Sequence, residues 1–340
     1  MVTNLLHPPL NSNAINADHL LADGGKADVR NFKYSVVVPV FNGRDKIDEL
    51  FDRIKKTFEA RQCRYEIVIV NDGSTDDTWH VIEKAAAKNP NIVAIKLTRN
   101  FGQHPAVLCG LANSSGDYML TIDADLQNPP EELFKLIEPA VENNLDLIFA
   151  KFAKKQHAFY RNLGSKVISR LNEIIFGKPK NLNISNVRIM SKELVTKMCH
   201  HKTAFPYING LALICSDPDR RANVLVEHHK RIGSESTYTP VRIAKLVCTI
   251  IFNYSKLPKL ISNIGYGTAW FSLVLGVAFV AKHALLSSSF PEFAPVLAVM
   301  AFCNAILALL VGLLGQYSEK MMETMSINSS YEVGSIIKGE

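Results

Sequence analysis

The sequence predicts an α/β protein with a mostly parallel β-sheet covered by helices on both faces, followed by a hairpin of two transmembrane helices. Two observations lead to this fold class. Between residues 34 and 150, apolar runs of strand length alternate with stretches of helical periodicity, and that alternation is typical of parallel sheets. Beyond residue 263 the chain has two long segments without a charged residue, as helices that cross a bilayer require.

The composition limits the class of protein. The chain has 340 residues, of which 47% are hydrophobic and 21% are charged, so a folded core is expected and a disordered chain is excluded. The formal net charge of +6 is mild. It suits partners such as phosphates or anionic lipid headgroups, and it gives no reason to expect nucleic acid. The six cysteines form no Cys-x-x-Cys pair, which argues against a zinc site or a disulfide framework.

The expected strands are short apolar runs, of which the first, at 34–39, is β-branched and typical of a buried strand. They lie at residues 34–39, 66–70, 92–97, 118–122, 146–150 and 222–227. Helices are expected at residues 46–59, 76–88, 104–112, 130–142 and 160–176. Because ligands of such sheets bind at the carboxyl ends of the strands, the residues that follow each strand are the candidates for a functional site.

The chain is expected to fall into five segments. These are a flexible tail at 1–30, the α/β domain at 31–240, an amphipathic helix region at the membrane surface at 241–262, the transmembrane hairpin at 263–318 and a cytoplasmic tail at 319–340. The surface helix is inferred because apolar residues are mixed there with basic ones, which suits a helix lying at a lipid headgroup region.

The two uncharged segments, 264–281 and 293–318, are each long enough to cross a hydrocarbon core of about 30 Å. Basic residues flank the hairpin at Lys256, Lys259 and Lys320, and this favours a cytoplasmic location for both termini. The charge of Lys282, between the two segments, opposes that orientation. The alternative is a helical hairpin buried in a soluble domain, but uncharged runs of this length are typical of membrane spans.

An aspartate-rich motif follows the fourth expected strand. In an extended chain Asp123, Asp125 and Gln127 would point to the same side. Carboxylate and amide oxygens at the carboxyl end of a strand suit Mg²⁺ or Mn²⁺, which proteins hold with few side chains together with substrate phosphates. The alternative is a turn that caps the helix expected at residue 130.

A second motif follows the strand at 66–70. Asp72 is placed where a carboxylate can accept hydrogen bonds from a nucleobase or ribose, and Gly73 permits close approach of the backbone. A capped turn between strand and helix would explain the residues after Gly73 but not Asp72. Neither a Gly-x-Gly-x-x-Gly run after the first strand nor a Walker-type loop is found in the sequence, so dinucleotide-dependent oxidoreductases and P-loop enzymes lose their main support.

Several motifs in this order resemble family 2 glycosyltransferases of the GT-A fold, and among them the polyprenyl-phosphate glycosyltransferases. The motifs are VVVPVFN at 36–42, VNDGS at 70–74, RNFGQH at 99–104 and DADLQNPPE at 123–131. The likeness extends from about residue 34 to residue 331, and it includes RIGSESTY at 231–238 and GLLGQY at 312–317. The resemblance implies a Rossmann-like GT-A domain.

The resemblance also implies roles for matching residues. The nucleotide-sugar would be bound by Pro39, Val40, Asp72, Asp123 and Ala124. The metal, Mg²⁺ or Mn²⁺, would be held by Asp125 and Gln127. The acceptor phosphate would be bound by Arg161, Arg188, Arg231, Ser234 and Tyr238. The residues expected to carry catalysis are Asp123, Asp125 and Arg231.

Two positions depart from the family pattern. Gly43 stands where the family usually has Glu, and Asn186 stands where it tends to have Asp. Asn186 cannot serve as a general base. A phosphate monoester has a second pKa of about 6 and is largely dianionic at neutral pH, so the acceptor itself could attack the anomeric carbon with inversion.

The expected function is therefore a metal-dependent inverting transfer of sugar from a UDP- or GDP-sugar to an undecaprenyl- or dolichyl-type phosphate. The transfer would occur at the cytoplasmic face of the inner membrane and serve cell-envelope glycan or lipid modification. Two alternatives stay open: a family 2 enzyme with another lipid or glycan acceptor, and a catalytically silent scaffold that binds nucleotide. The lipid bilayer is an expected partner, and the hairpin is compatible with a homo-oligomer.

Overall fold

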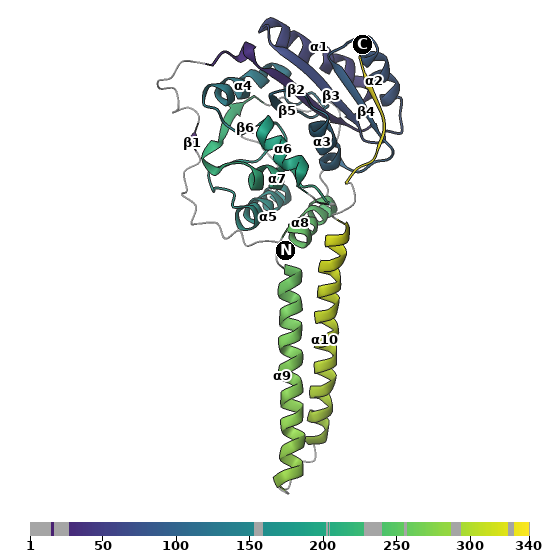
Figure 1. Cartoon of the computed structure of the whole chain (residues 1–340), viewed down its shortest axis with the longest axis vertical. Coiled ribbons are helices and arrows are strands. Elements are labelled where there is room, and N and C mark those ends of the chain that lie inside the picture. Colours follow the sequence, from purple (N-terminus) through teal and green to yellow (C-terminus); the bar gives the residue numbers. More distant parts are fainter. Residues whose placement is uncertain are drawn as a thin grey trace. The chain divides into compact units, whose positions relative to one another are not determined.

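The computed structural model describes residues 15–16, 27–152, 159–201, 203, 205–227, 240–254, 257–286, 294–325 and 330–339. The chain divides into two compact units (Figure 1). The first comprises Met1–Ile243 and Ser329–Glu340, and the second comprises Ala244–Asn328. Each unit is described in its own right.

The first unit is built on one sheet with the strand order β1-β8-β6-β7-β5-β2-β3-β4-β9. Its strands are β1 (Ile15–Asn16), β2 (Lys33–Val40), β3 (Arg64–Asn71), β4 (Ile92–Leu97), β5 (Tyr118–Thr121), β6 (Leu147–Phe152), β7 (Arg188–Ser191), β8 (Arg221–Val226) and β9 (Val333–Lys338). Five pairings are parallel. The pairings of β4 with β9 and of β7 with β5 and β6 are antiparallel. The mostly parallel sheet predicted from the sequence is therefore confirmed.

The antiparallel strand β7 decides where the site forms. It lies between β5 and β6, and its first residue, Arg188, is paired with Thr121 at the end of β5 and with Phe149 of β6. Because β7 is antiparallel to both neighbours, its amino end meets their carboxyl ends. A side chain from β7 thereby reaches the edge of the sheet where ligands of α/β proteins bind.

Helices cover both faces of the sheet. The α-helices of this unit are α1 (Arg44–Ala60), α2 (Thr78–Ala86), α3 (Gln103–Ala112), α4 (Leu133–Glu142), α5 (Phe159–Phe176), α6 (Lys192–His200) and α7 (Ile208–Cys215). Three short 3₁₀ helices lie at η2 (Val29–Asn31), η3 (Pro130–Glu132) and η4 (Pro218–Arg220). The helices α1 to α5 match the helices predicted from the sequence.

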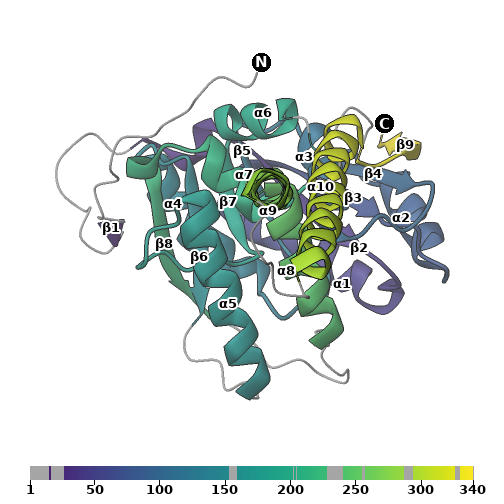
Figure 2. The ribbon, with the colours of Figure 1, turned by 90° about the horizontal axis from the view of Figure 1, so that it is seen from below.

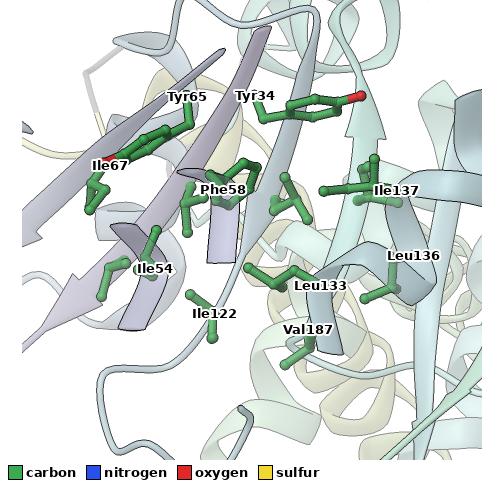
Figure 3. Close-up of a cluster of buried hydrophobic side chains, with 14 of the residues drawn as sticks. Tyr34, Ile54, Phe58, Tyr65, Ile67, Ile122, Leu133, Leu136, Ile137 and Val187 are labelled. Carbon is green, nitrogen blue, oxygen red and sulfur yellow. The ribbon is translucent and has the colours of Figure 1, made fainter. Parts of the chain in front are cut away.

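The core follows from the alternation of side chains along the strands. On one face, α1 and α4 bring Phe58 and Phe134 into ring contact at 5.3 Å between centroids, within the cluster drawn in Figure 3. On the other face, α3 lies so close to the sheet that a Cβ at Gly110 would meet Val70 Cγ2 at 3.1 Å. The close approach of α3 brings its amino end to the carboxyl edge of the sheet.

The second unit is helical. Its helices are α8 (Pro240–Tyr254), α9 (Leu257–Leu286) and α10 (Ala294–Met325). Within α9 and α10 the segments Lys259–Lys282 and Val299–Glu319 are long and apolar enough to cross a membrane. Figure 2 shows the two helices side by side. The expected hairpin of two long apolar helices is thereby present.

The two helices meet at glycines. A Cβ at Gly265 would lie 2.7 Å from the backbone nitrogen of Gly312, so only glycine fits there. Ser262 Oγ donates a hydrogen bond to the Gly312 carbonyl at 3.0 Å, and Tyr266 Oη donates to Gln316 Oε1 at 2.7 Å. The hairpin is thus held by close backbone packing and by hydrogen bonds between helices, as is typical of membrane helices.

Three details differ from the predicted boundaries. The region 241–262 holds all but the first residue of α8 and the beginning of α9 rather than one surface helix. The predicted tail at 319–340 contains the end of α10 and the strand β9, which pairs with β4. The predicted tail at 1–30 contains β1, which pairs with β8. These two strands are short or partly exposed, so their sequences lack the continuous apolar run of a buried strand.

Candidate active site

The candidate site lies where β2, β5 and β7 meet the amino end of α3. A cavity there is lined by Pro39, Gln103, His104, Val107, Thr121, Ile122, Asp123, Asn186 and Arg188. Of the residues predicted from the sequence, the cavity brings together Pro39, Asp123 and Arg188. These come from three separate strands or strand ends, which the order of the sheet makes neighbours.

Asp123 is the acidic group of this cavity. Its Oδ1 accepts a hydrogen bond of 2.6 Å from Gln103 Nε2, and the side-chain amide of Asn186, which lines the same cavity, acts to lower the pKa of this carboxyl. Burial, followed by the negative charge of Asp125, raises the pKa of Asp123 to about 6. Arg188 acts in the opposite direction. The two aspartates therefore repel each other at neutral pH, and a cation between them would relieve that repulsion.

The aspartate motif is a turn rather than an extended strand. Strand β5 ends at Thr121, and Leu126 has a φ of 61°. Asp125 Oδ1 accepts a hydrogen bond of 3.1 Å from the backbone nitrogen of Gln127, as in an Asx turn. Strand alternation, on which the sequence argument relied, is therefore the wrong reason for placing these residues together. The turn following β5 brings Asp123 and Asp125 within electrostatic range.

The donor set fits a divalent cation. Asp125 and Gln127 offer hard oxygen ligands beside the charge of Asp123, which are the ligand types that Mg²⁺ and Mn²⁺ take. Among the residues that the structure describes, no three His, Cys, Asp or Glu side chains lie close enough together to hold a metal ion by themselves. A cation here would need further ligands from a substrate, and a diphosphate would supply them.

Asp72 has a different environment from the one expected. Only 4% of it is exposed, and its two carboxylate oxygens accept hydrogen bonds from the backbone nitrogens of Phe101 at 2.7 Å and Gly102 at 2.9 Å. A Cβ at Gly73 would meet Asn100 N at 2.5 Å. Both residues after β3 therefore fix the loop that leads into α3. The contact predicted between Asp72 and a nucleotide stays a prediction.

Arg188 is a buried cation, with 2% of its surface exposed. Its Nε donates to Thr121 Oγ1 at 3.0 Å, Nη1 donates to Asn209 Oδ1, and the guanidinium lies 6.0 Å from the Phe149 ring centroid. Burial lowers its pKa to about 10. The charge of Asp123 acts on the guanidinium, and both residues line the cavity, so the positive potential of Arg188 reaches the cavity.

The remaining predicted residues divide into two groups. Val40 ends β2 and is buried, and Ala124 lies in the turn after β5, partly exposed. Arg161 belongs to α5, but its side chain lies outside the described residues, as do Arg231, Ser234 and Tyr238. The structure consequently leaves the predicted acceptor-phosphate set untested apart from the position of Arg188.

Three polar residues of the cavity were not singled out as site residues from the sequence: Gln103, His104 and, as a contact of Asp123, Asn186. His104 packs edge-to-face on Tyr207, with the ring centroids 5.2 Å apart. Burial, with a smaller effect from Arg188, lowers the pKa of His104 to about 4, so the imidazole is neutral at physiological pH. Gln103 and His104 could have been identified from the sequence. They belong to the RNFGQH run, which follows the strand at 92–97 and therefore lies at the same edge of the sheet.

The sequence matches the family described as Glycosyl transferase family 2 over residues 35–200. It is 30% identical over 319 residues to the undecaprenyl-phosphate 4-deoxy-4-formamido-L-arabinose transferase of Klebsiella pneumoniae (strain 342), a match that covers 90% of this chain and 94% of that protein. The fold is similar to two structures of glucosyl-3-phosphoglycerate synthase from Mycobacterium tuberculosis. One, with Mn²⁺, UDP and phosphoglyceric acid, gives a TM-score of 0.52 at 19% identity over 67% of this chain and 78% of that chain.

The second structure of that synthase, with Mn²⁺, UDP-glucose and phosphoglyceric acid, gives a TM-score of 0.52 at 18% identity over 68% of this chain and 84% of that chain. These structural likenesses establish the GT-A fold of the first unit. The sequence match to the Klebsiella transferase extends over nearly the full length of both proteins. The chain therefore belongs to glycosyltransferase family 2, and it is a glycosyltransferase.

Proposed function

We propose that this protein transfers a sugar from a UDP- or GDP-sugar to a polyprenyl phosphate at the cytoplasmic face of the inner membrane. One observation carries the proposal. The same chain contains the Asp123–Asp125 turn at the edge of the sheet and two helices that are apolar enough to cross a membrane. The likeness to an undecaprenyl-phosphate transferase extends along both, which supports a lipid phosphate as the acceptor.

A divalent cation belongs to the proposal. Asp125 and Gln127 would hold Mg²⁺ or Mn²⁺, which would neutralise the charge that develops on the departing nucleoside diphosphate. Asp123 would contact the ribose or diphosphate beside it, and Pro39, Val40, Asp72 and Ala124 would form the rest of the nucleotide site. In this assignment Asp72 acts mainly by fixing the loop at Phe101 and Gly102.

The acceptor phosphate is the proposed nucleophile. A phosphate monoester is largely dianionic at neutral pH, so it can displace the nucleotide at the anomeric carbon directly, with inversion. His104, neutral because of its burial, leaves the positive potential on this side of the cavity to Arg188. Arg188 would attract anionic groups to the cavity from its fixed, buried position, while Arg161, Arg231, Ser234 and Tyr238 would contact the acceptor phosphate itself. Arg231, together with Asp123 and Asp125, would carry catalysis.

The test is sugar transfer in membranes that contain the full chain, with added undecaprenyl phosphate and a panel of labelled UDP- and GDP-sugars. A labelled lipid that forms with Mn²⁺ or Mg²⁺ and disappears with chelator is the expected result. Asp125→Asn should reduce transfer roughly 10³-fold, because the leaving diphosphate loses its main electrostatic partner. Asp52→Asn, which alters an exposed carboxylate on α1, should leave the rate unchanged. Absence of labelled lipid with every donor would contradict the proposal.

A further inference from the structure

Asp123 is held from two sides by amide groups. Gln103, the first residue of α3, donates its Nε2 hydrogen to Asp123 Oδ1 at 2.6 Å. Asn186 lies just before β7, and its side-chain amide favours the charged form of the Asp123 carboxyl, because it acts to lower the pKa of that group. Both residues line the cavity with Asp123. A carboxylate on a loop after a strand has freedom to turn, and two donors from different elements remove it.

The backbone that carries each amide is fixed. The loop that leads to Gln103 is held by Asp72, which accepts the backbone hydrogens of Phe101 and Gly102. The backbone carbonyl of Asn186 accepts a hydrogen bond of 2.5 Å from Thr121 Oγ1. That hydroxyl in turn accepts the Nε hydrogen of the buried Arg188. Both amides therefore start from backbone positions that hydrogen bonds fix at the edge of the sheet.

The donors are neutral, and this has a thermodynamic consequence. An amide satisfies a carboxylate without adding charge, whereas a second carboxylate would repel it unless a proton or a cation lay between them. Asp123 already experiences the charge of Asp125. A third negative charge would make the metal-free arrangement less favourable, and neutral amides avoid that repulsion.

We propose that Gln103 and Asn186 are positioning residues that orient Asp123 for the nucleotide before any cation is bound, which weakens the coupling between metal binding and nucleotide binding in this protein. The inference rests on the proposed function, in that it takes the nucleotide part of the donor as the ligand of Asp123. It assigns Asn186 a role that an ionised acid at this position could not fill.

The test measures binding rather than turnover. The dissociation constants of UDP and GDP for the full chain in detergent are determined by calorimetry with Mn²⁺ and with chelator, and their ratio reports the coupling. Asn186→Asp should raise that ratio roughly tenfold, mostly by weakening binding in chelator. Gln103→Glu should raise it less, because Gln103 is exposed and its charge is screened by water. Asn186→Ala should raise the ratio of the two dissociation constants by an amount between those for Gln103→Glu and Asn186→Asp.

Matched controls carry the same chemical changes elsewhere. Asn183→Asp lies three residues away, is exposed, and is bonded to Asn223 through its backbone; Gln62→Glu is exposed after α1. Both should keep the wild-type ratio. A variant that merely damages the fold weakens binding equally with and without metal, so an unchanged ratio in Asn186→Asp overturns the inference while leaving the proposed function intact. A wild-type chain that binds neither UDP nor GDP overturns both.

Discussion

The site and the helical hairpin are held together in opposite ways. At the sheet edge, Asp123 and Arg188 are fixed by directional hydrogen bonds from several elements. In the hairpin, the crossing at Gly265 and Gly312 depends on backbones that touch because no side chain intervenes. Most of the outward side chains there are apolar and exposed, Trp270 at 69% for example.

The difference fits the surroundings that we propose for each region, water for the first unit and lipid for the hairpin. In water, burying apolar surface drives folding. The stability gained in the core of the first unit offsets the free energy lost by burying polar groups around the cavity. In lipid, apolar side chains gain little by leaving the solvent, so helices associate through close packing and a few hydrogen bonds. Substitutions should therefore separate activity from stability in the first region, and should act on stability alone in the second.

The largest expected effect is on activity, for Arg188→Met. Methionine fills a similar volume, but it leaves the buried Asn209 Oδ1 without its donor, so stability should fall by about 1–3 kcal/mol. Transfer should fall at least about 100-fold, because positive potential is lost beside Asp123. The comparison requires transfer assays and chemical denaturation of the same preparations.

Arg221→Met supplies the control for this comparison. Arg221 is equally buried, but it donates to the carbonyls of Leu213 and Ser216 at the end of α7. Its loss should lower stability by about 1–3 kcal/mol, because those carbonyls are left without a donor, and it should spare the rate per folded molecule. If Arg188→Met left the rate per folded molecule unchanged, as Arg221→Met should, the contrast between a charge that serves function and one that serves structure would be wrong.

The next effect tests the hairpin. Gly265→Leu places a side chain against the backbone of α10, which no change of rotamer relieves, and should destabilise the hairpin by up to about 3 kcal/mol. A Cβ at Gly267, two residues along, meets no atom within 4 Å, so Gly267→Leu should be close to neutral. Unfolding in mixed micelles, followed by circular dichroism, measures both. Equal stability of the two variants would show that close packing does not hold the helices together.

The fold was largely predictable because its main signals are local in the sequence. The short apolar runs of β2 to β6 and the uncharged lengths of α9 and α10 can be recognised without tertiary information. Strands β7 and β9 were missed because each pairs antiparallel at a position that the alternation of strands and helices does not specify. β9 is separated in sequence from its partner β4 by the whole second unit, and no local pattern reveals such a pairing.

The site was predictable by residue type and less so by geometry. Asp123, Asp125 and Arg188 were singled out from motifs, and the structure places Asp123 and Arg188 on one cavity. The roles of Gln103 and Asn186 depend on hydrogen bonds between residues 20 and 63 positions from Asp123, which no sequence spacing specifies. Asp123 and Asp125 lie near each other because the chain turns at Leu126. They do not lie on one side of an extended strand, as strand alternation predicts.

A smaller effect should appear in the pH dependence of stability. The pKa of His104 is lowered to about 4 by burial and by Arg188, so the unfolded chain binds a proton at higher pH than the folded one. Stability is therefore complete above pH 6.5 and falls as the pH is lowered from 6.5 towards 4. Between pH 8 and pH 5 this one residue should cost about 2 kcal/mol.

Urea denaturation of wild type and His104→Gln at the two pH values measures that contribution. The variant should lose about 2 kcal/mol less than wild type on acidification, since glutamine does not titrate. Parallel losses in the two proteins would mean that the imidazole is as easily protonated in the fold as in water. The measurement uses stability rather than activity, so it is independent of the donor and the acceptor.

The smallest expected effect concerns the hydrogen bond across the hairpin. Tyr266→Phe removes the donor to Gln316 Oε1 while it retains the ring that packs on Gly312. Hydrogen bonds between membrane helices contribute about 0.6 kcal/mol on average, so the variant should be destabilised by that amount and Gly265→Leu by several times more. Tyr317→Phe, an exposed tyrosine on α10, serves as the control and should be neutral. A loss from Tyr266→Phe as large as that from Gly265→Leu would reverse the comparison, because the hairpin would then depend on directional hydrogen bonds as the candidate site does.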